Sequence, residues 1–546
     1  MKKPLVLLIR DGWGIGKDCP GNAVKLAKMQ HLPRLLKDYP NTQLEASGRA
    51  VGLREGVQGS SEVGHLNMGA GRIVEQEMVR VDNLIESGEF FKHPKLLGAI
   101  ENCRKNRSSL HLMGLVQDQG VHALEEHLYA LLELARREKL SSVFVHFFAD
   151  GRDTPPQSAL VYLERLEKKI QELGVGPIAS VVGRYYAMDR GKNWERTKRA
   201  YDALVSGIGF RARSAREAIE SAYQRTNPDT HGQETDEFIQ PTVIVDENGN
   251  PISTVKPGDS MILFNFRQDR AIQLSMAFVE PDFSFFDRGP LLQIAYLGMT
   301  CYYDEFRQYV IPPMNMANLV GELLSREGLW QLRISEYQKY RHVTSFFNGK
   351  RIEPYPREDR IQVPSITVPE DTKPEMSAYE VTELAVEAIT HGIEAVRKKA
   401  RGADGTTCHF DESLPNSRGA DSYDVIVMNY ANPDMVGHTG NLEAAVKAVE
   451  VVDRCIGAVV EATLRRGGVA LITADHGNVE QMIDPVTGKV QTAHTTNPVD
   501  FILVGEGLQT TRLRPSGILS DVGPTLLQLL GLSIPKEMTA RSLIER

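Results

Sequence analysis

A chain of 546 residues is longer than one ordinary domain, so we expect two domains. Its 71 acidic residues outnumber its 63 basic residues, a mildly acidic balance that argues against a general nucleic-acid-binding protein. Five scattered cysteines without a Cys-x-x-Cys pair are typical of a reduced, intracellular protein, and no apolar run reaches membrane-spanning length. We therefore expect a cytoplasmic protein with no membrane or nucleic-acid partner.

The first predicted element is a buried strand at residues 5–9, inside the segment PLVLLIRDGWG. Similar apolar runs occur in YDVIVMNYANPDMVGH (423–438) and GVALITADHGN (468–478). Continuous runs of this kind are typical of strands buried on both faces of a parallel sheet. Each is followed by an acidic residue, Asp11, Asp434 or Asp475. One such residue alone would more often cap a helix, but three at the carboxyl ends of parallel strands predict a ligand site.

Two adjacent serines, Ser60 and Ser61, lie in the glycine-rich stretch VQGSSEVGHLNMGAGR. The order Gly59-Ser60-Ser61-Glu62 before apolar residues is typical of a helix N-terminus, where a serine oxygen caps free backbone N–H groups. The Gly-x-Ser-x-Gly pattern of common hydrolases is absent. Judged alone, the stretch favours a cap over a nucleophile.

The middle of the chain has its own alternation of strands and helices. Strand-then-loop segments at 141–156, 176–190 and 256–271 end in arginines rather than in metal-ligand residues. We therefore expect a second α/β domain, residues 77–311, inserted into a first α/β domain formed by residues 1–76 and 312–546. A lone arginine is usually part of a surface ion pair, but five at strand ends favour a pocket for phosphate or carboxylate. They are Arg152, Arg184, Arg190, Arg267 and Arg270.

Beyond residue 312 the apolar spacing predicts helices over 376–399, 442–465 and 518–530. Residues 401–422 are rich in Gly, Ser and Asp and are expected to form an exposed loop.

Carboxylates and imidazoles gather around the three predicted strand ends. Asp434 and His438 lie four residues apart, Asp475 and His476 are adjacent, and His494 lies in QTAHTTNP. Mixed carboxylate and imidazole ligands suit Mn²⁺, Zn²⁺ and related ions, and the absence of cysteine argues against a structural zinc site. Any one of these histidines alone is more often structural. Taken together with the three aspartates, including Asp11, the histidines favour a metal centre that holds one ion or two. A hydroxyl bound to such an ion loses its proton more easily, which favours a serine nucleophile after all.

Ten stretches that follow one another along nearly the whole chain carry a family resemblance. They are LIRDGWG, SSEVGHLNMGAGR, GVHALEEH, DGRDTPP, GRYYAMDR, FNFRQDRAIQLS, KPEMSAYEV, NPDMVGHTG, ADHGNVE and AHTTNPV. With these motifs the chain closely resembles the 2,3-bisphosphoglycerate-independent phosphoglycerate mutase family of the alkaline phosphatase superfamily. It departs from the family pattern at Gln119, where glycine is usual, at Gln268, where proline is frequent, and at Ser60, where asparagine is usual.

The resemblance implies an alkaline-phosphatase-like metal domain and an inserted substrate-binding and phosphotransferase domain. It identifies Ser61 as the phosphorylated nucleophile and implies two divalent ions, most commonly Mn²⁺, with Mg²⁺, Co²⁺ and Zn²⁺ as alternatives. Asp434, His438 and His494 match the ligands of one ion. Asp11, Ser61, Asp475 and His476 match those of the other. The matched substrate-binding residues are His122, Arg152, Asp153, Arg184, Arg190, Arg267, Arg270 and Lys339.

The activity implied by the resemblance is interconversion of 3-phosphoglycerate and 2-phosphoglycerate in glycolysis and gluconeogenesis, without 2,3-bisphosphoglycerate. Asp153 is expected to shuttle the hydroxyl protons, held in place by Arg152. We expect a monomer whose partner is this small-molecule substrate. The alternatives are another metal-dependent phosphatase, phosphodiesterase or phosphomutase of the same superfamily, and a non-catalytic metal- or anion-binding relative.

Overall fold

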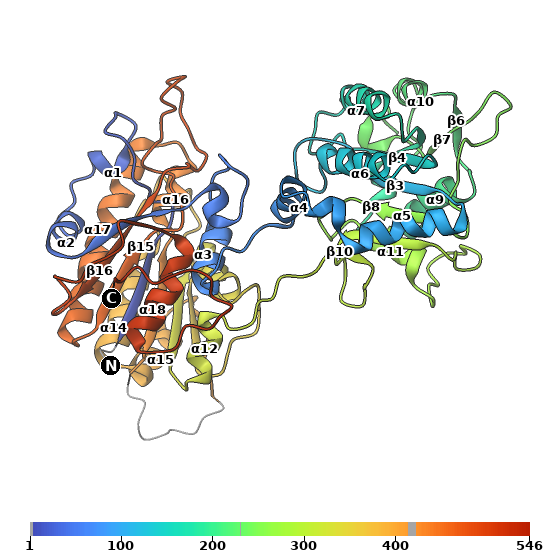
Figure 1. Ribbon diagram of the computed structural model, residues 1–546. Coiled ribbons are helices and arrows are strands. Elements are labelled where there is room, and N and C mark those ends of the chain that lie inside the picture. The colour runs from blue at the N-terminus through green and yellow to red at the C-terminus, as the bar shows by residue number, and fades with distance from the viewer. Residues whose placement is uncertain (1–3, 230, 413–421, 546) are drawn as a thin grey trace. The chain divides into compact units, whose positions relative to one another are not determined.

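The computed structural model describes residues 4–229, 231–412 and 422–545, and the chain forms two compact units (Figure 1). Unit 1 comprises Met1–Glu75 and Asn315–Arg546, and unit 2 comprises Gln76–Met314. Each unit has its own sheet, its own covering helices and its own hydrophobic core. The predicted α/β fold class is confirmed.

The centre of the unit 1 sheet consists of the three strands predicted from the apolar runs. Strand β1 (Leu5–Arg10) pairs in parallel with β14 (Val425–Tyr430) on one side and with β15 (Val469–Thr473) on the other. Leu7 lies opposite both Val427 and Leu471, and every residue of the three strands is buried. The carboxyl ends of the three strands therefore meet at one edge of the sheet.

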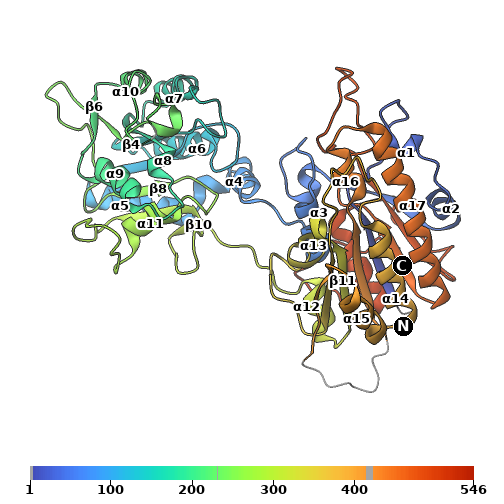
Figure 2. The ribbon, with the colours of Figure 1, turned by 180° about the vertical axis from the view of Figure 1, so that it is seen from behind.

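The full sheet has nine strands in the order β13-β12-β11-β14-β1-β15-β16-β2-β17. The remaining strands are β2 (Asn41–Glu45), β11 (Gln331–Glu336), β12 (Glu358–Val363), β13 (Thr407–His409), β16 (Val499–Gly505) and β17 (Ser516–Ile518). Helices α3 (Ser61–Ala70) and α18 (Val522–Leu530) lie over one face, and α14 (Ala378–His391) and α17 (Leu442–Arg465) over the other (Figures 1 and 2). The other helices are α1 (Ala23–Leu26), α2 (Leu32–Asp38), α12 (Val320–Arg326), α13 (Tyr337–Arg341), α15 (Ile393–Gly402) and α16 (Asn432–Gly437).

Two helix predictions in unit 1 need correction. The segment 376–399 is not one helix but two, α14 and α15, because Gly392 adopts a φ of +85° between them. The segment 518–530 is helical only from its 3₁₀ turn at Leu519–Asp521 onward, since Ile518 ends strand β17. Helix α17 spans the predicted 442–465. Of the predicted loop at 401–422, residues 413–421 lie outside the described residues.

Unit 2 has an eight-stranded sheet in the order β10-β9-β8-β3-β4-β5-β7-β6. Its strands are β3 (Leu110–Leu115), β4 (Val143–Ala149), β5 (Ile178–Gly183), β6 (Phe210–Ala212), β7 (Thr242–Ile244), β8 (Ser260–Leu263), β9 (Ala295–Thr300) and β10 (Tyr309–Ile311). Its helices are α4 (Glu77–Glu86), α5 (Pro94–Asn106), α6 (Glu125–Arg137), α7 (Ala159–Leu173), α8 (Arg184–Ala187), α9 (Trp194–Val205), α10 (Ala215–Ala222) and α11 (Ile272–Val279). The strands predicted within 141–156, 176–190 and 256–271 are β4, β5 and β8. They run parallel with β3, so their carboxyl ends also share one edge.

Among the described helices, none combines the length and the apolar character needed to cross a membrane.

Candidate functional site

In unit 1 the structure brings all seven predicted metal ligands to one edge of the sheet. Asp11 directly follows β1, Asp475 lies two residues after β15, and Asp434 lies in α16, just after β14. These three carboxylates and the His476 side chain are buried. The predicted ligands are Asp11, Ser61, Asp434, His438, Asp475, His476 and His494.

Asp434, His438 and His494 form the first group. Oδ1 of Asp434 lies 3.3 Å from Nε2 of His438 and 3.1 Å from Nε2 of His494, and the two Nε2 atoms are 3.0 Å apart. Backbone carbonyl oxygens contact the opposite ring nitrogens, Thr492 O at 2.7 Å from Nδ1 of His438 and Gly59 O at 2.8 Å from Nδ1 of His494. Because a carbonyl can only accept, we assign the protons to Nδ1 and leave both Nε2 lone pairs facing Asp434.

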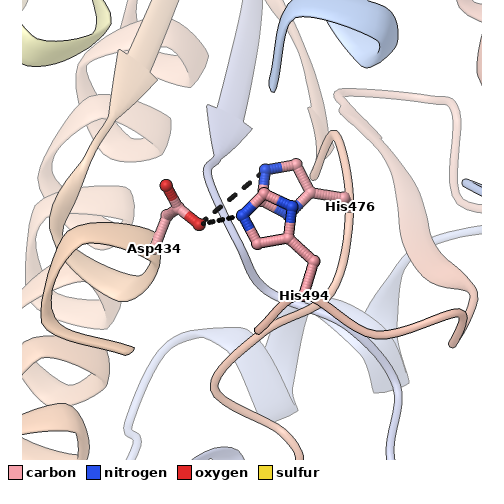
Figure 3. A group of neighbouring side chains, drawn as sticks. All are labelled: Asp434, His476 and His494. Carbon is pink, nitrogen blue, oxygen red and sulfur yellow. Dashed lines mark ion pairs between the residues drawn. The ribbon is translucent and has the colours of Figure 1, made fainter. Parts of the chain in front are cut away.

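Asp11, Ser61, Asp475 and His476 form the second group. Ser61 is the first residue of α3, and its hydroxyl oxygen lies 3.0 Å from Oδ1 of Asp11 and 3.0 Å from Nε2 of His476. The Asp475 carboxylate accepts a hydrogen bond from the Gly12 backbone N–H at 3.3 Å. His476 also faces Asp434 at 3.8 Å, and its ring stacks on His494 with centroids 3.9 Å apart, so the two groups adjoin (Figure 3).

These residues fit divalent metal ions. The ligand atoms of Asp434, His476 and His494 all lie within 4.8 Å of one another, and so do those of Asp11, Asp475 and His476. Ligand atoms about 2.0–2.2 Å from one ion are expected to be a little over 3 Å apart, close to the separations in the first group. The carbonyl contacts to Nδ1 are the outer hydrogen bonds that orient metal-binding histidines in proteins.

Lys339 lies among the same carboxylates, not with the arginines of the predicted substrate pocket. Its Nζ is 2.8 Å from Asp11, 2.5 Å from Asp434 and 2.7 Å from the Ser61 oxygen. Burial by itself lowers the pKa of this ammonium, but the Asp11 and Asp434 carboxylates raise it above its usual value. Burial likewise opposes ionisation of both carboxyls, yet Lys339 holds the pKa of each well below its usual range.

The predicted substrate-binding residues of unit 2 gather at the carboxyl ends of its strands. Arg184, at the start of α8, pairs through Nη1 with Asp150 at 2.5 Å and with Asp153 at 2.6 Å. Asp269 pairs with Arg190 at 2.7 Å and with Arg267 at 3.2 Å. His122 lies 3.8 Å from Asp153 and 3.7 Å from Asp269. Arg270 donates to the Met188 carbonyl at 3.0 Å.

The charges in unit 2 act on one another. Burial and the charge of Arg184 lower the pKa of His122 to about 4, so its imidazole is neutral at physiological pH. Burial lowers the pKa of Arg270, and the neighbouring Arg184, Arg190 and Arg152 lower it further. Arg270 is repelled by the positive charges of three neighbouring arginines, and an anionic ligand bound here would relieve this repulsion.

One expected contact is wrong. Asp153 is held by Arg184, whereas Arg152 lies 3.5 Å from Glu237. The reason is the turn after β4, in which the backbone N–H groups of Arg152 and Asp153 both donate to Asp150 at 3.1 Å. This tight turn directs the two adjacent side chains to different partners.

Comparison with known proteins assigns the family. Residues 81–304 match the model of the BPG-independent PGAM N-terminus, and residues 406–534 match that of the metalloenzyme superfamily. A 2,3-bisphosphoglycerate-independent phosphoglycerate mutase of Acetivibrio thermocellus is 50% identical, with both chains covered in full. The chain belongs to this phosphoglycerate mutase family. A relative of the same name from Moorella thermoacetica is 48% identical over 100% of this chain and 99% of its own.

A solved structure supports the same assignment. The phosphoglycerate mutase of Leishmania mexicana, described at low cobalt concentration, is 32% identical and superposes with a TM-score of 0.58. The match covers 100% of this chain and 98% of that one. The prediction of an enzyme, a cofactor-independent phosphoglycerate mutase, is confirmed. Use of divalent metal is supported by the superfamily match together with the two clusters of ligand atoms, one from Asp434, His476 and His494 and one from Asp11, Asp475 and His476.

Several residues that contact the predicted set were missed in the sequence. Asp150 contacts Arg184, and Asp269 contacts Arg190 and Arg267. The two acids lie inside the motifs DGRDTPP and FNFRQDRAIQLS. Asn429 donates to Asp11 at 2.7 Å and lies 3.1 Å from Nε2 of His65. Asn429 could have been noticed in the sequence, because it is a polar residue near the end of the apolar run VIVMNY.

We expect Arg184→Lys to lower kcat/KM by roughly 10- to 100-fold, because the shorter lysine side chain does not place its ammonium where Nη1 of Arg184 contacts both Asp150 and Asp153, and a charged hydrogen bond contributes about 1.5–3 kcal/mol. Steady-state kinetics with phosphoglycerate measure this. The matched control is Arg190→Lys, since Arg190 is half-exposed and its one ion pair among the described residues is with Asp269. Equal losses in the two variants would contradict a special role for the buried Arg184.

Proposed function

We propose that the protein interconverts 3-phosphoglycerate and 2-phosphoglycerate through a phosphorylated Ser61 at a centre for two divalent ions. The observation that carries this proposal is the setting of the Ser61 oxygen, which lies 3.0 Å from Asp11, 3.0 Å from His476 and 2.7 Å from Lys339. A serine that only capped a helix would not need two candidate metal ligands and an ammonium around its hydroxyl.

Divalent ions bound by the two groups would lower the pKa of the serine hydroxyl and neutralise charge on the phosphate. Asp434, His438 and His494 are the proposed ligands of one ion, and Asp11, Ser61, Asp475 and His476 those of the other. The mixed carboxylate and imidazole set favours Mn²⁺, with Mg²⁺, Co²⁺ and Zn²⁺ as alternatives.

The first half of the reaction forms a bond between the Ser61 oxygen and phosphorus and breaks the bond from phosphorus to the substrate oxygen. Lys339 donates a hydrogen bond to the serine oxygen and so stabilises its deprotonated form. The second half reverses the transfer onto the other hydroxyl of the bound glycerate. Covalent catalysis thus divides one displacement into two.

The unit 2 group supplies the remaining functions. Arg152, Arg184, Arg190, Arg267 and Arg270, with His122, are proposed to bind the carboxylate and phosphate of the substrate. Asp153 is proposed to protonate the departing glycerate oxygen and to take the proton from the attacking one. Its contact with Arg184 at 2.6 Å holds the carboxyl group in a fixed orientation for these steps.

The two rival functions are less well supported. Another metal-dependent phosphatase or phosphomutase of the superfamily would share the unit 1 ligands but would not need the arginine group of unit 2. A non-catalytic relative would not need the Ser61 hydroxyl. Cytoplasmic location, the monomeric state and the absence of a nucleic-acid partner stay predictions.

The test is an enolase-coupled assay of 3-phosphoglycerate with Mn²⁺ and without 2,3-bisphosphoglycerate, combined with mass spectrometry of the quenched enzyme. Turnover with phosphate on the peptide that contains Ser61 supports the proposal. Release of inorganic phosphate instead of 2-phosphoglycerate would favour the phosphatase alternative.

Metal binding is expected to release protons at neutral pH. Burial lowers the pKa of His476, but Asp475, Asp11 and Asp434 outweigh it and raise the pKa to about 9. The imidazole is therefore protonated at pH 7 without metal and must lose that proton to become a ligand, so affinity falls as the pH falls below 9. Calorimetric titration with Mn²⁺ in two buffers of different ionisation enthalpy measures the released protons. Binding without proton release at pH 7 would contradict this assignment.

A further inference from the structure

Glu480 is a buried acidic residue next to the metal-ligand loops, but it does not belong to either ligand group. Its side chain is 1% exposed and it lies four residues after His476. Within the described part of the chain, no lysine, arginine or histidine forms an ion pair with it. A buried carboxylate is unfavourable unless hydrogen bonds replace its hydration, so its partners show what it does.

Four donors bind the Glu480 carboxylate, two on each oxygen. Oε2 accepts the backbone N–H groups of Gly14 at 3.0 Å and Asn478 at 2.8 Å. Oε1 accepts the side-chain amide of Asn497 at 2.9 Å and the hydroxyl of Thr495. The carboxylate is thus fully hydrogen-bonded by neutral groups.

These donors come from three loops that carry metal ligands. Gly14 lies three residues after Asp11, Asn478 lies two residues after His476, and Thr495 directly follows His494. A backbone hydrogen bond of 2.9 Å from Thr495 to Gly477 joins the second and third loops directly. One carboxylate therefore connects the loops of both ligand groups.

The loops pack closely around this side chain. A Cβ on Gly14 would lie 2.5 Å from the carboxyl carbon of Glu480, and a Cβ on Gly477 would lie 2.3 Å from its Oε1. A larger residue at either position would therefore displace the Glu480 carboxylate. The connection extends to the fourth ligand segment, because the side chain of Asn478 donates to Asp434 at 3.4 Å.

We propose that Glu480 is a positioning residue that fixes the separation of the metal-ligand loops in the metal-free protein. The inference rests on the proposed two-ion centre. Before an ion binds, Lys339 offsets only part of the mutual repulsion of Asp11, Asp434 and Asp475, and loops free to separate would relieve the remainder at the cost of metal affinity. The hydrogen bonds of Glu480 prevent that separation, and its negative charge adds to the attraction for cations.

The experiment compares Mn²⁺ binding by chelator-treated wild-type protein and by Glu480→Met, which keeps the side-chain volume and removes every hydrogen bond. Calorimetric titration is expected to show two ions in the wild type and at least tenfold weaker binding in the variant. Saturating Mn²⁺ is expected to restore turnover, because Glu480 does not contact the reacting groups.

Two milder variants test the same idea if Glu480→Met fails to fold. Glu480→Gln keeps an acceptor for the two backbone donors, while the Thr495 hydroxyl and the Asn497 amide can reorient toward its NH₂ group. We expect a loss of affinity of only a few-fold. Thr495→Val removes one donor and is expected to weaken binding chiefly at the ion held by His494.

The matched control is Asp453→Leu in the same unit. Asp453 is 1% exposed and accepts backbone N–H groups of Gln30 at 2.7 Å, His31 at 3.0 Å and Leu32 at 2.7 Å, but its partners carry no ligand. It is expected to lower the melting temperature and leave Mn²⁺ affinity unchanged. If folded Glu480→Met, or both milder variants, bind Mn²⁺ as tightly as the wild type, the inference about Glu480 is overturned and the proposed function is not affected. Absence of Mn²⁺ binding by the wild type overturns the proposed function together with it.

Discussion

Replacing Ser61 by alanine is expected to abolish mutase activity, with a loss on the order of 10⁴-fold or more. The substitution deletes only the oxygen that is proposed to carry the phosphate, at the first residue of α3. The fold is expected to survive, since alanine is a good helix former and the apolar contacts of α3 remain. Enolase-coupled turnover and circular dichroism measure the two effects.

The neighbouring Ser60 provides a matched control for this experiment. Its hydroxyl caps α3 by accepting from the Val63 backbone N–H at 3.5 Å, and it is not one of the proposed ligands. Ser60→Ala is therefore expected to cost about 1 kcal/mol of stability and to leave substantial activity. An essential Ser60 with a dispensable Ser61 would reverse the assignment.

Removal of divalent metal is expected to stop turnover completely, and Mn²⁺ or a similar ion is expected to restore it. Without ions, the acidic residues around Ser61 repel a phosphate group, and the serine hydroxyl keeps its proton. The test measures turnover after treatment with a chelator and verified removal of the metal, and again after Mn²⁺ is added back. Mn²⁺ added to Ser61→Ala serves as the control and should restore nothing. Full turnover in excess chelator would exclude the proposed mechanism.

The core of unit 1 was predictable because its central strands are buried on both faces. Such strands consist of continuous apolar runs, so LVLLI, VIV and VALIT were visible without any structure. Parallel pairing then placed Asp11, Asp434 and Asp475 at one edge. Helix α17 was predictable for a related reason, since its apolar residues keep helical spacing along its full length.

What could not be predicted depends either on the conformation of a single residue or on contacts between residues far apart in the chain. The spacing in 376–399 continues smoothly, and only the conformation of Gly392 divides it into α14 and α15. Sequence motifs grouped Lys339 with the arginines as a substrate ligand, whereas its ammonium lies between Asp11 and Asp434. Glu480 stands in the conspicuous stretch ADHGNVE, but three of its four donors are supplied by other loops, at Gly14, Thr495 and Asn497.

The position of β1 at the centre of its sheet has a consequence for synthesis on the ribosome. Its neighbours begin at Val425 and Val469, more than 400 residues later in the chain. At about 5–20 residues per second, roughly 20 to 80 s pass before the first of them is made. Unit 2 is continuous in sequence and can fold during this interval, while the apolar segment Leu5–Ile9 waits unpaired. Of the strands in this sheet, this first segment is therefore exposed to aggregation, and available to chaperones, for the longest time.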